Sequence, residues 1–532
     1  MGLVPVETDA GGSGRWCIAR RVNSVKPGKV WLVGAGPGDP GLITVRGRDL
    51  LAQADVVLYD ALSHPALLEA CPASAELRDV GKRGGSKNPS QDWITSQLID
   101  LAQSGRNVVR LKGGDPSLFA RGAEEALALA RAGVEFEIVP GVSSPVAASA
   151  YAGIPMTHRD LSSSVTFITG SDREGKTWSP DAWRRLATAT ETICVLMGMQ
   201  RIDAITRALI DGGRSPHTPS AVVQWAARPA QRVVTAPLAQ IAEAAHAAGL
   251  SNPALIMVGD VVSLREELRW YDRLPLFGRQ LLVPRPEHQA GGTAEAIRRR
   301  GAEPIVIPSI EIGPSPDPEA LRAAVRGVQN YDFCLFTSAN GVERFFEAML
   351  ELGRDARAFA SCRVGAIGPK TAQALVPHGI VADLVAREFV GEALARDILE
   401  IGGVRRVLIP RALVAREELP ELLRAGGMTV DVVAAYETRP AGARHKDRLL
   451  ELLHQEELDV VLFTSSSTVD SLVELLGPDA TALLSRVTLA CIGPITAATA
   501  QRHGLEVAVS AETYTVEGLL DALERHYARS VS

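Results

Sequence analysis

The sequence is poor in cysteine and in aromatic residues. Its six cysteines are scattered over 532 residues, and no two of them form a Cys-x-x-Cys pair. Zinc and iron–sulfur sites built on such pairs are therefore excluded, and we predict no metal site. Buried free thiols in a reducing compartment account for these cysteines. Aromatic residues make up only 5% of the chain, so aliphatic side chains must fill most of its cores.

The sequence also lacks long apolar runs and an excess of positive charge. No run approaches the roughly 20 residues that span a bilayer, and residues 1–29 contain no apolar core of a secretory signal. The net charge of −6 gives no general attraction to nucleic acid. We therefore expect a cytoplasmic protein that acts on small molecules, without membrane or nucleic-acid partners, and with a flexible tail at residues 1–28.

The composition is that of a globular protein, with 46% hydrophobic and 22% charged residues. A prior of roughly 150 residues per domain gives three or four domains. Short apolar stretches such as Val30–Val33, Val108–Leu111 and Ala254–Val258 alternate with stretches of helical spacing such as Leu42–Ala54. This alternation predicts an α/β fold, with parallel sheets covered by helices. At 269–278 aromatic, charged and proline residues follow one another, which predicts a linker between units at 29–268 and 279–528.

The later unit contains an internal repeat. Phe-Thr-Ser occurs at 336–338 and again at 463–465, 127 residues on, and Ile-Gly-Pro occurs at 367–369 and again at 492–494, 125 residues on. A near-constant spacing of this kind predicts two similar α/β lobes. Small-molecule sites favour the space between two such bodies, so we expect one large ligand there.

Two glycine-rich loops in the earlier unit each follow a predicted strand and carry an aspartate. The first, at 34–41, is not a dinucleotide loop, because Asp39 replaces the third glycine and an acidic side chain repels a pyrophosphate. The second, at 111–116, carries Asp115. A cationic ligand without phosphate, S-adenosylmethionine, fits both loops. The alternative is that both aspartates only cap tight turns.

The earlier unit carries six distinctive stretches: VWLVGAGPGDPGLITVRG (30–47), ADVVLYDAL (54–62), VGKRGG (80–85), VVRLKGGDPSLFARGAEE (108–125), VPGVSSPVAASAYAGIPMTHRD (139–160) and PALIMVGDVV (253–262). Through these stretches residues 29–265 resemble the uroporphyrinogen-III C-methyltransferases of the tetrapyrrole methylase family. The resemblance implies two α/β subdomains, at about 29–138 and 139–268, and a homodimer formed through this unit.

The resemblance also assigns roles to residues. It implies that S-adenosylmethionine is bound by Pro37, Gly113, Gly114, Asp115, Leu118, Ser143, Ser144, Met197, Ala226, Pro253 and Ala254. Asp60 is implied as the proton acceptor, Lys82 as the proton donor, and Arg83 as an anchor for substrate carboxylates. The alternatives are that Asp60 caps a strand end and that Lys82 only anchors substrate.

The later unit contains, in this order, FTSANGV (336–342), AIGPKTAQAL (366–375), AAYETRP (434–440), FTSSSTV (463–469) and CIGPITAATA (491–500). Through these stretches residues 279–528 resemble uroporphyrinogen-III synthases. The resemblance implies one lobe at about 279–311 plus 440–528 and another at about 312–439. Two connecting strands are expected near Ile305–Ile312 and Val432–Arg439. No cofactor is implied for this unit. Hydroxyl and arginine side chains are the candidate substrate-binding residues: Arg285, Thr337, Ser338, Thr371, Arg411, Thr464 and Ser465. The hydroxyls have an alternative role as helix caps.

Tyr436 and Thr496 are the candidates for assisting loss of water in this unit, and packing between the lobes is the alternative for Tyr436. The two resemblances together imply an enzyme of tetrapyrrole biosynthesis. It would cyclise hydroxymethylbilane to uroporphyrinogen III with inversion of ring D, and then methylate the product at C2 and C7 to give precorrin-2. The alternative is a methylase of a later corrin precursor with a tetrapyrrole-sensing C-terminal module.

Overall fold

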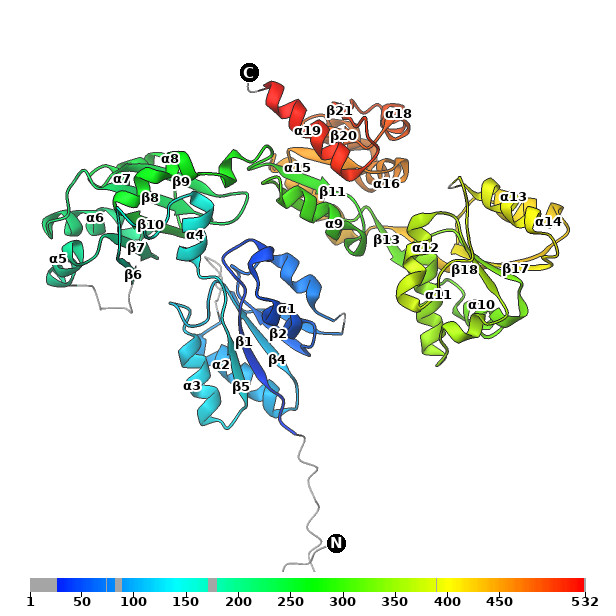
Figure 1. Ribbon diagram of the computed structural model, residues 1–532, viewed down its shortest axis with the longest axis horizontal. Helices are drawn as coiled ribbons and strands as arrows, with labels where there is room; N and C mark the ends of the chain where they lie inside the picture. Colours follow the sequence, from blue (N-terminus) through cyan, green and yellow to red (C-terminus); the bar gives the residue numbers. More distant parts are fainter. Residues whose placement is uncertain (1–25, 73, 82–88, 171–178, 389, 531–532) are drawn as a thin grey trace, which may run out of the picture. The chain divides into compact units, whose positions relative to one another are not determined.

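A computed structural model describes residues 26–72, 74–81, 89–170, 179–388 and 390–530. These residues form two compact units that divide between Arg273 and Leu274, and each unit contains two β-sheets (Figure 1). The α/β prediction is confirmed. Among the described helices, none combines the length and the apolar character that crossing a membrane requires.

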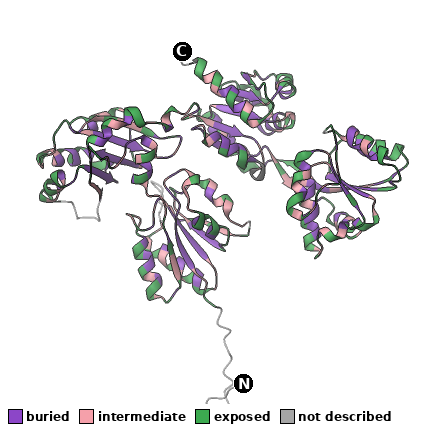
Figure 2. Cartoon of the chain, viewed as in Figure 1, coloured by how far each residue is buried: buried purple, intermediate pink, exposed green. Residues whose placement is uncertain are grey.

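The first sheet of the first unit is entirely parallel, with strand order β3-β2-β4-β1-β5. Its strands are β1 (Val30–Gly34), β2 (Val56–Tyr59), β3 (Glu76–Asp79), β4 (Val108–Lys112) and β5 (Phe136–Val139). Alternate residues of β1 enter two different cores: Val30 and Leu32 pack with α2 (Gln91–Gln103) and α3 (Gly122–Arg131). Trp31 and Val33 pack with α1 (Val45–Leu51) on the other face. Because both faces are covered, the central strands β1, β2 and β4 are almost entirely buried (Figure 2), while the edge strands β3 and β5 are partly exposed.

The second sheet has strand order β6-β7-β10-β8-β9, and here the prediction of a parallel sheet is wrong. Only β6 and β7 run parallel, while β10 is antiparallel to both of its neighbours and β9 is antiparallel to β8. Residues 225–231 join β8 directly to β9, and a parallel pair would need a crossover of about a dozen residues or more. The strands are β6 (Val165–Thr169), β7 (Thr192–Leu196), β8 (Pro219–Gln224), β9 (Arg232–Pro237) and β10 (Ala254–Val258), with helices α4 (Ser144–Ala152), α5 (Pro180–Ala189), α6 (Ile202–Asp211), α7 (Ile241–Ala247) and α8 (Arg265–Leu268).

The predicted linker at 269–278 is packed at both of its ends. The ring centroids of Trp270 and Tyr271 lie 5.3 and 4.8 Å from that of Tyr151 in α4. Leu276 is fully buried in a core of the second unit. The segment therefore belongs partly to each unit.

The second unit contains one lobe built from both of its ends and one lobe built from its middle. The first lobe carries the parallel sheet β12-β11-β19-β20-β21. The second lobe carries the sheet β13-β18-β17-β14-β15-β16, which is parallel except that β13 is antiparallel to β18. The strands are β11 (Gln280–Val283), β12 (Glu303–Val306), β13 (Ile310–Gly313), β14 (Phe333–Phe336), β15 (Arg363–Ala366), β16 (Leu384–Val385), β17 (Arg406–Ala412), β18 (Thr429–Pro440), β19 (Val460–Phe463), β20 (Thr488–Cys491) and β21 (Val509–Ser510). The larger helices are α9 (Glu287–Arg298), α10 (Pro318–Arg326), α11 (Ala339–Glu351), α13 (Gly391–Ile401), α14 (Glu418–Ala425), α15 (Ala443–His454), α16 (Ser466–Leu476), α18 (Pro494–Arg502) and α19 (Val516–Ser530).

The sequence repeat corresponds to a structural repeat. Strands β14 and β19 each lead into a helix whose N-cap is the serine of Phe-Thr-Ser. Strands β15 and β20 each lead through a glycine into α12 (Pro369–Leu375) and α18, with proline at the helix start. Between the lobes, Ile310–Gly313 pairs with Glu437–Pro440, a shorter ribbon than the expected Ile305–Ile312, because Glu303–Val306 joins the first lobe's sheet instead.

Candidate active site

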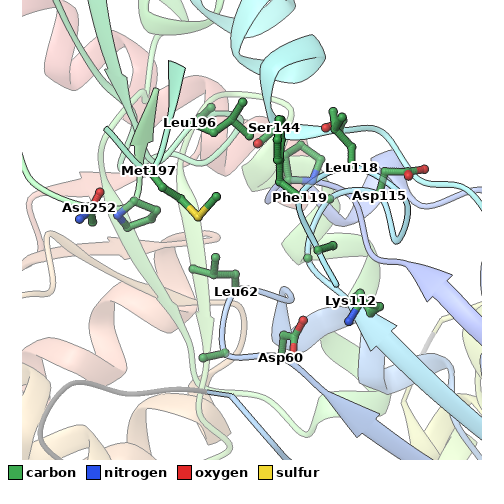
Figure 3. Close-up of a pocket in the computed structure, with 18 of the residues that line it drawn as sticks. Asp60, Leu62, Lys112, Asp115, Leu118, Phe119, Ser144, Leu196, Met197 and Asn252 are labelled. Atoms are coloured by element: carbon green, nitrogen blue, oxygen red, sulfur yellow. The ribbon is translucent and has the colours of Figure 1, made fainter. Parts of the chain in front are cut away.

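One cavity of about 560 Å³ in the first unit gathers the predicted donor-binding residues. It lies at the carboxyl ends of β1, β2 and β4, and its other wall comes from the ends of β7 and β8 and the start of β10. In Figure 3, Asp60 and Lys112 lie at one end of the view and Leu196 and Met197 at the other. The predicted residues that line the cavity are Pro37, Asp60, Gly113, Gly114, Asp115, Leu118, Ser143, Ser144, Met197, Ala226, Pro253 and Ala254.

Close backbone packing requires glycine where the loops of the first sheet meet. The amide of Gly114 donates to the carbonyl of Gly36 at 2.8 Å, and the amide of Gly36 donates back at 3.2 Å. A Cβ on Gly141 would lie 2.4 Å from the carbonyl oxygen of Gly114. Gly36 and Gly114 have φ of 76° and 70°, in the left-handed region that favours glycine. Together these glycines let three loops approach one another at one edge of the cavity.

The two aspartates of the glycine loops organise backbone rather than present free charge. Asp115 accepts hydrogen bonds from the amides of Ser117 at 2.7 Å and Gly141 at 2.9 Å. Asp39 accepts from the amide of Gly41 at 2.7 Å and from the hydroxyl of Tyr151 at 2.6 Å, and it does not line the cavity. Asp39 therefore caps a turn, the alternative that the sequence left open, and joins its loop to α4 through Tyr151.

Strained backbone clusters around the same cavity. Phe119, Met197 and Trp225 have φ of 54°, 53° and 50°, in the left-handed region that bulky residues avoid, and all three line the cavity. Such strain persists only where the surrounding structure fixes it, and it concentrates at functional sites. The side chains of these residues give the cavity apolar surface.

A network of buried charges closes one end of the cavity. Arg110, whose side chain is 3% exposed, donates to Asp60 at 2.5 Å and to Glu125 at 3.2 Å. Lys112, 2% exposed, pairs with Glu125 at 2.9 Å. Burial and the nearby charge of Arg110 lower the pKa of Lys112, while Glu125 opposes that change. The fixed guanidinium of Arg110 thus holds the carboxyl group of Asp60 in place at the cavity wall.

In the second unit, the predicted residues of the middle lobe include a hydroxyl pair. The hydroxyls of Ser338 and Tyr436 lie 3.0 Å apart and share a hydrogen bond, and Tyr436 is 6% exposed. Thr337 is half-buried beside Ser338, and Thr371 is buried in the first turn of α12. Arg411 is turned into its own lobe, where it donates to the carbonyl of Arg416 at 2.7 Å and pairs with Glu417.

The other lobe presents the matching positions. Ser465 caps α16 in a capping box with Thr468, and Thr496 is buried in the first turn of α18. The buried hydroxyl of Thr464 has no hydrogen-bond partner among the described residues. Arg285 follows β11 and is half-buried. The pKa of Lys370, in α12 of the other lobe, is lowered first by burial and then by the positive charge of Arg285. A pair of cations from two lobes suits an anionic ligand.

The comparisons with known proteins agree with this two-part architecture. Residues 29–242 match the family of Tetrapyrrole (Corrin/Porphyrin) Methylases, and residues 292–521 match Uroporphyrinogen-III synthase HemD. The porphyrin biosynthesis protein HemD of Ruminiclostridium josui is 39% identical over 497 residues, which cover 93% of this chain and 97% of that protein. The chain belongs to both families. It is a bifunctional enzyme of tetrapyrrole biosynthesis, with a methylase unit followed by a synthase unit.

Two further similarities concern the methylase unit. The uroporphyrinogen-III C-methyltransferase of a Sinorhizobium species is 46% identical over 258 residues, which cover 48% of this chain and 91% of that protein. The second is a crystal structure, that of uroporphyrin-III C-methyl transferase from Thermus thermophilus complexed with S-adenyl homocysteine. Its sequence is 40% identical, and the match covers 44% of this chain and 100% of that chain, with a TM-score of 0.39.

Two of the predicted methylase residues lie outside the described residues, and two residues at the cavity were not predicted from sequence. Lys82 and Arg83 lie in the segment 82–88, which is not described. Arg228 was not predicted: it donates to the carbonyl of Leu62 at 2.6 Å and lies 5.1 Å from the Trp225 ring. No sequence pattern signals that contact, which spans 166 residues. Glu125 was also not predicted, although it ends the stretch RGAEE after the second glycine loop.

Proposed function

We propose that the methylase unit transfers two methyl groups from S-adenosylmethionine to C2 and C7 of uroporphyrinogen III, giving precorrin-2. The synthase unit supplies that substrate by cyclising hydroxymethylbilane with inversion of ring D and loss of water. The observation that carries the proposal is the convergence of every predicted donor-binding residue on one cavity. The relative named a uroporphyrinogen-III C-methyltransferase, at 46% identity, supports the choice of substrate.

The cavity has the chemistry to hold S-adenosylmethionine. Leu118, Met197, Ala226 and Pro253 offer apolar surface for an adenosyl group, and Ser143 and Ser144, at the start of α4, offer hydroxyl and amide donors for a carboxylate. The sulfonium supplies an already activated methyl group. The protein therefore needs mainly to align donor and acceptor carbon and to exclude water.

Asp60 is the proton acceptor in this proposal. Carbon methylation of a pyrrole leaves a cationic macrocycle that must lose a proton, and the side chain of Asp60 at the cavity wall can receive it. The hydrogen bond from Arg110 fixes the direction of the Asp60 side chain. Lys82 as the donor and Arg83 as a carboxylate anchor complete the assignment.

In the synthase unit, Tyr436 assists departure of the hydroxyl of hydroxymethylbilane by donating its phenolic proton. The shared hydrogen bond with Ser338 orients the phenol. Thr496, buried in the first turn of α18, is the second residue proposed to assist loss of water. The carboxylates of the folded chain are held by hydroxyls and helix-start amides at Thr337, Thr371, Thr464 and Ser465. Arg285 adds charge, while Arg411 serves its own lobe through Glu417.

The test is incubation of the full chain with hydroxymethylbilane and S-adenosylmethionine, followed by mass analysis. A trimethylated product is not expected; two added methyl groups on a type III macrocycle support the proposal. Uroporphyrinogen III given directly should also gain two methyl groups, and no transfer to it would favour a methylase of a later corrin precursor. Only spontaneous type I macrocycle from hydroxymethylbilane would favour a sensing role for the synthase unit.

The proposal includes the setting in which the enzyme works. We place it in the cytoplasm as a homodimer formed through the methylase unit. Light scattering on the purified chain should give twice the mass of one chain. A mass of one chain, at concentrations where methyl transfer proceeds, would contradict the dimer.

A further inference from the structure

Glu125 is the most deeply buried member of the charge network at the methylase cavity. It lies in the first turn of α3, its side chain is 0% exposed, and it does not line the cavity. Its carboxylate contacts Arg110, Lys112 and the side-chain amide of Gln91, which donates at 2.9 Å. Burying a carboxylate to this degree costs folding free energy unless opposite charges and hydrogen-bond donors compensate for its lost hydration.

The geometry of Arg110 explains what that charge does. Its Nε donates to Glu125, its Nη2 donates to Asp60, and its Nη1 donates to the carbonyls of Leu58 at 3.3 Å and Leu111 at 3.2 Å. Every nitrogen of the guanidinium is therefore occupied. Because the guanidinium is planar and rigid, fixing Nε on Glu125 sets the direction in which Nη2 meets Asp60.

The charges also need Glu125 to balance. Arg110 and Lys112 lie on alternate positions of β4 and are both nearly fully buried. Without Glu125 the two cations would share Asp60, whose side chain is 30% exposed. Two other aspartates of this sheet accept hydrogen bonds from backbone amides. Asp79, at the end of β3 on the other side of β2, accepts from Gly81 at 2.8 Å. Asp115, after β4, accepts from Ser117 and Gly141.

We propose that Glu125 is a positioning residue for methyl transfer, which orients Arg110 toward Asp60 and neutralises Lys112 in the cavity wall. The inference rests on the proposed function, in which Asp60 accepts the proton. Glu125 does not touch the substrate; it acts through Arg110 and Lys112.

The test compares methyl transfer by the full chain and its E125Q variant, with uroporphyrinogen III and S-adenosylmethionine, across pH. Removing the negative charge of Glu125 strengthens the positive field of Arg110 and Lys112 on Asp60, which weakens Asp60 as a base. We expect kcat to fall on the order of 100-fold, the acid limb of the kcat profile to move to lower pH, and the KM for S-adenosylmethionine to stay within about 3-fold.

Two further variants separate positioning from stability. D272N breaks another buried ion pair of the same unit, with Arg265, away from the cavity. It should lower the melting temperature but leave kcat and the pH profile unchanged. K112M removes a positive charge and should move the acid limb to higher pH, opposite to E125Q. The double variant K112M/E125Q should bring the limb back toward the wild type, because one charge of each sign is lost.

The outcomes are distinguishable. If E125Q retains the kcat and the acid limb of the wild type, or changes only its melting temperature as D272N does, the inference is overturned. If E125Q does not fold, K112M alone decides, and an unmoved acid limb there overturns it. If the wild-type chain transfers no methyl group to uroporphyrinogen III, the proposed function fails instead.

Discussion

The candidate sites of the two units use different chemistry. In the methylase unit, charged side chains from β4, α3 and the end of β2 meet in one buried network beside a cavity. In the synthase unit, the candidates are mostly hydroxyls at the first turns of helices, repeated in two lobes. The difference follows from the reactions proposed. Methyl transfer to carbon needs a base held in place, whereas cyclisation of a reactive bilane needs a folded chain and a departing hydroxyl.

The largest effect should come from removing the base. D60N keeps the shape of the side chain but removes its charge, so methyl transfer should fall about 10³-fold, the range of a lost general base. Cyclisation of hydroxymethylbilane should be unchanged. Both rates are measured on one preparation, and an equal loss of both would mean that the two sites are not separate.

The second-largest effect should come from the close glycine contacts of the methylase unit. In G141A the new Cβ would meet the Gly114 carbonyl, and such overpacking costs about 1–3 kcal/mol. We expect S-adenosylhomocysteine, measured by calorimetry, to bind on the order of tenfold more weakly. G292A in α9, where a Cβ meets nothing within 4 Å, is the control and should leave binding unchanged. Unaltered binding in G141A would show that the glycine edge is not part of the donor site.

A third variant tests the synthase unit. Y436F removes the hydroxyl that Ser338 contacts, so cyclisation should slow about tenfold, with a stability loss of about 1 kcal/mol. Methyl transfer to added uroporphyrinogen III should not change. The product ratio of type III to type I macrocycle, read by chromatography, is the measurement. A wild-type ratio would leave Tyr436 with a packing role only.

The smallest effect concerns the repeated caps. S465A removes the side-chain cap of α16 and should lower the free energy of unfolding of the synthase unit by about 1 kcal/mol. S338A should cost a similar amount and also slow cyclisation, because it takes a partner from Tyr436. Denaturant unfolding and the cyclisation rate separate the two roles. Equal cyclisation rates in both variants would show that the two lobes contribute alike.

Local patterns account for what the sequence predicted well. Strand β1 is largely an apolar run, β4 begins with Val108 and Val109, and both strands lead into glycine loops, so the fold class and the glycine loops could be placed from sequence. Strand β3, Glu76–Asp79, carries charged residues and is half-exposed, so no apolar run marks it. The antiparallel pairing of β8 and β10 depends on contacts between segments far apart in the chain, which no single run of residues encodes.

The same limit applies to the site. The contact of Asp39 with Tyr151 could not be predicted from sequence, because the two residues lie 112 positions apart and only the folded chain brings them together. Asp60, Arg110 and Glu125 come from three elements, so their network is a property of packing. The repeat could be predicted from sequence because both copies have the same residues, Phe-Thr-Ser, at the start of their helices.

Construction of the synthase unit from both of its ends dictates an order of assembly during translation. Strand β11 pairs with β19, so Leu281 is synthesised long before its partner Val460. The middle lobe, in contrast, is one continuous segment from Ile310 to Pro440. The middle lobe can therefore close first, while β11 and β12 keep an unpaired apolar edge exposed to chaperones. A premature stop between residues 440 and 460 would leave that edge permanently open and prone to aggregation.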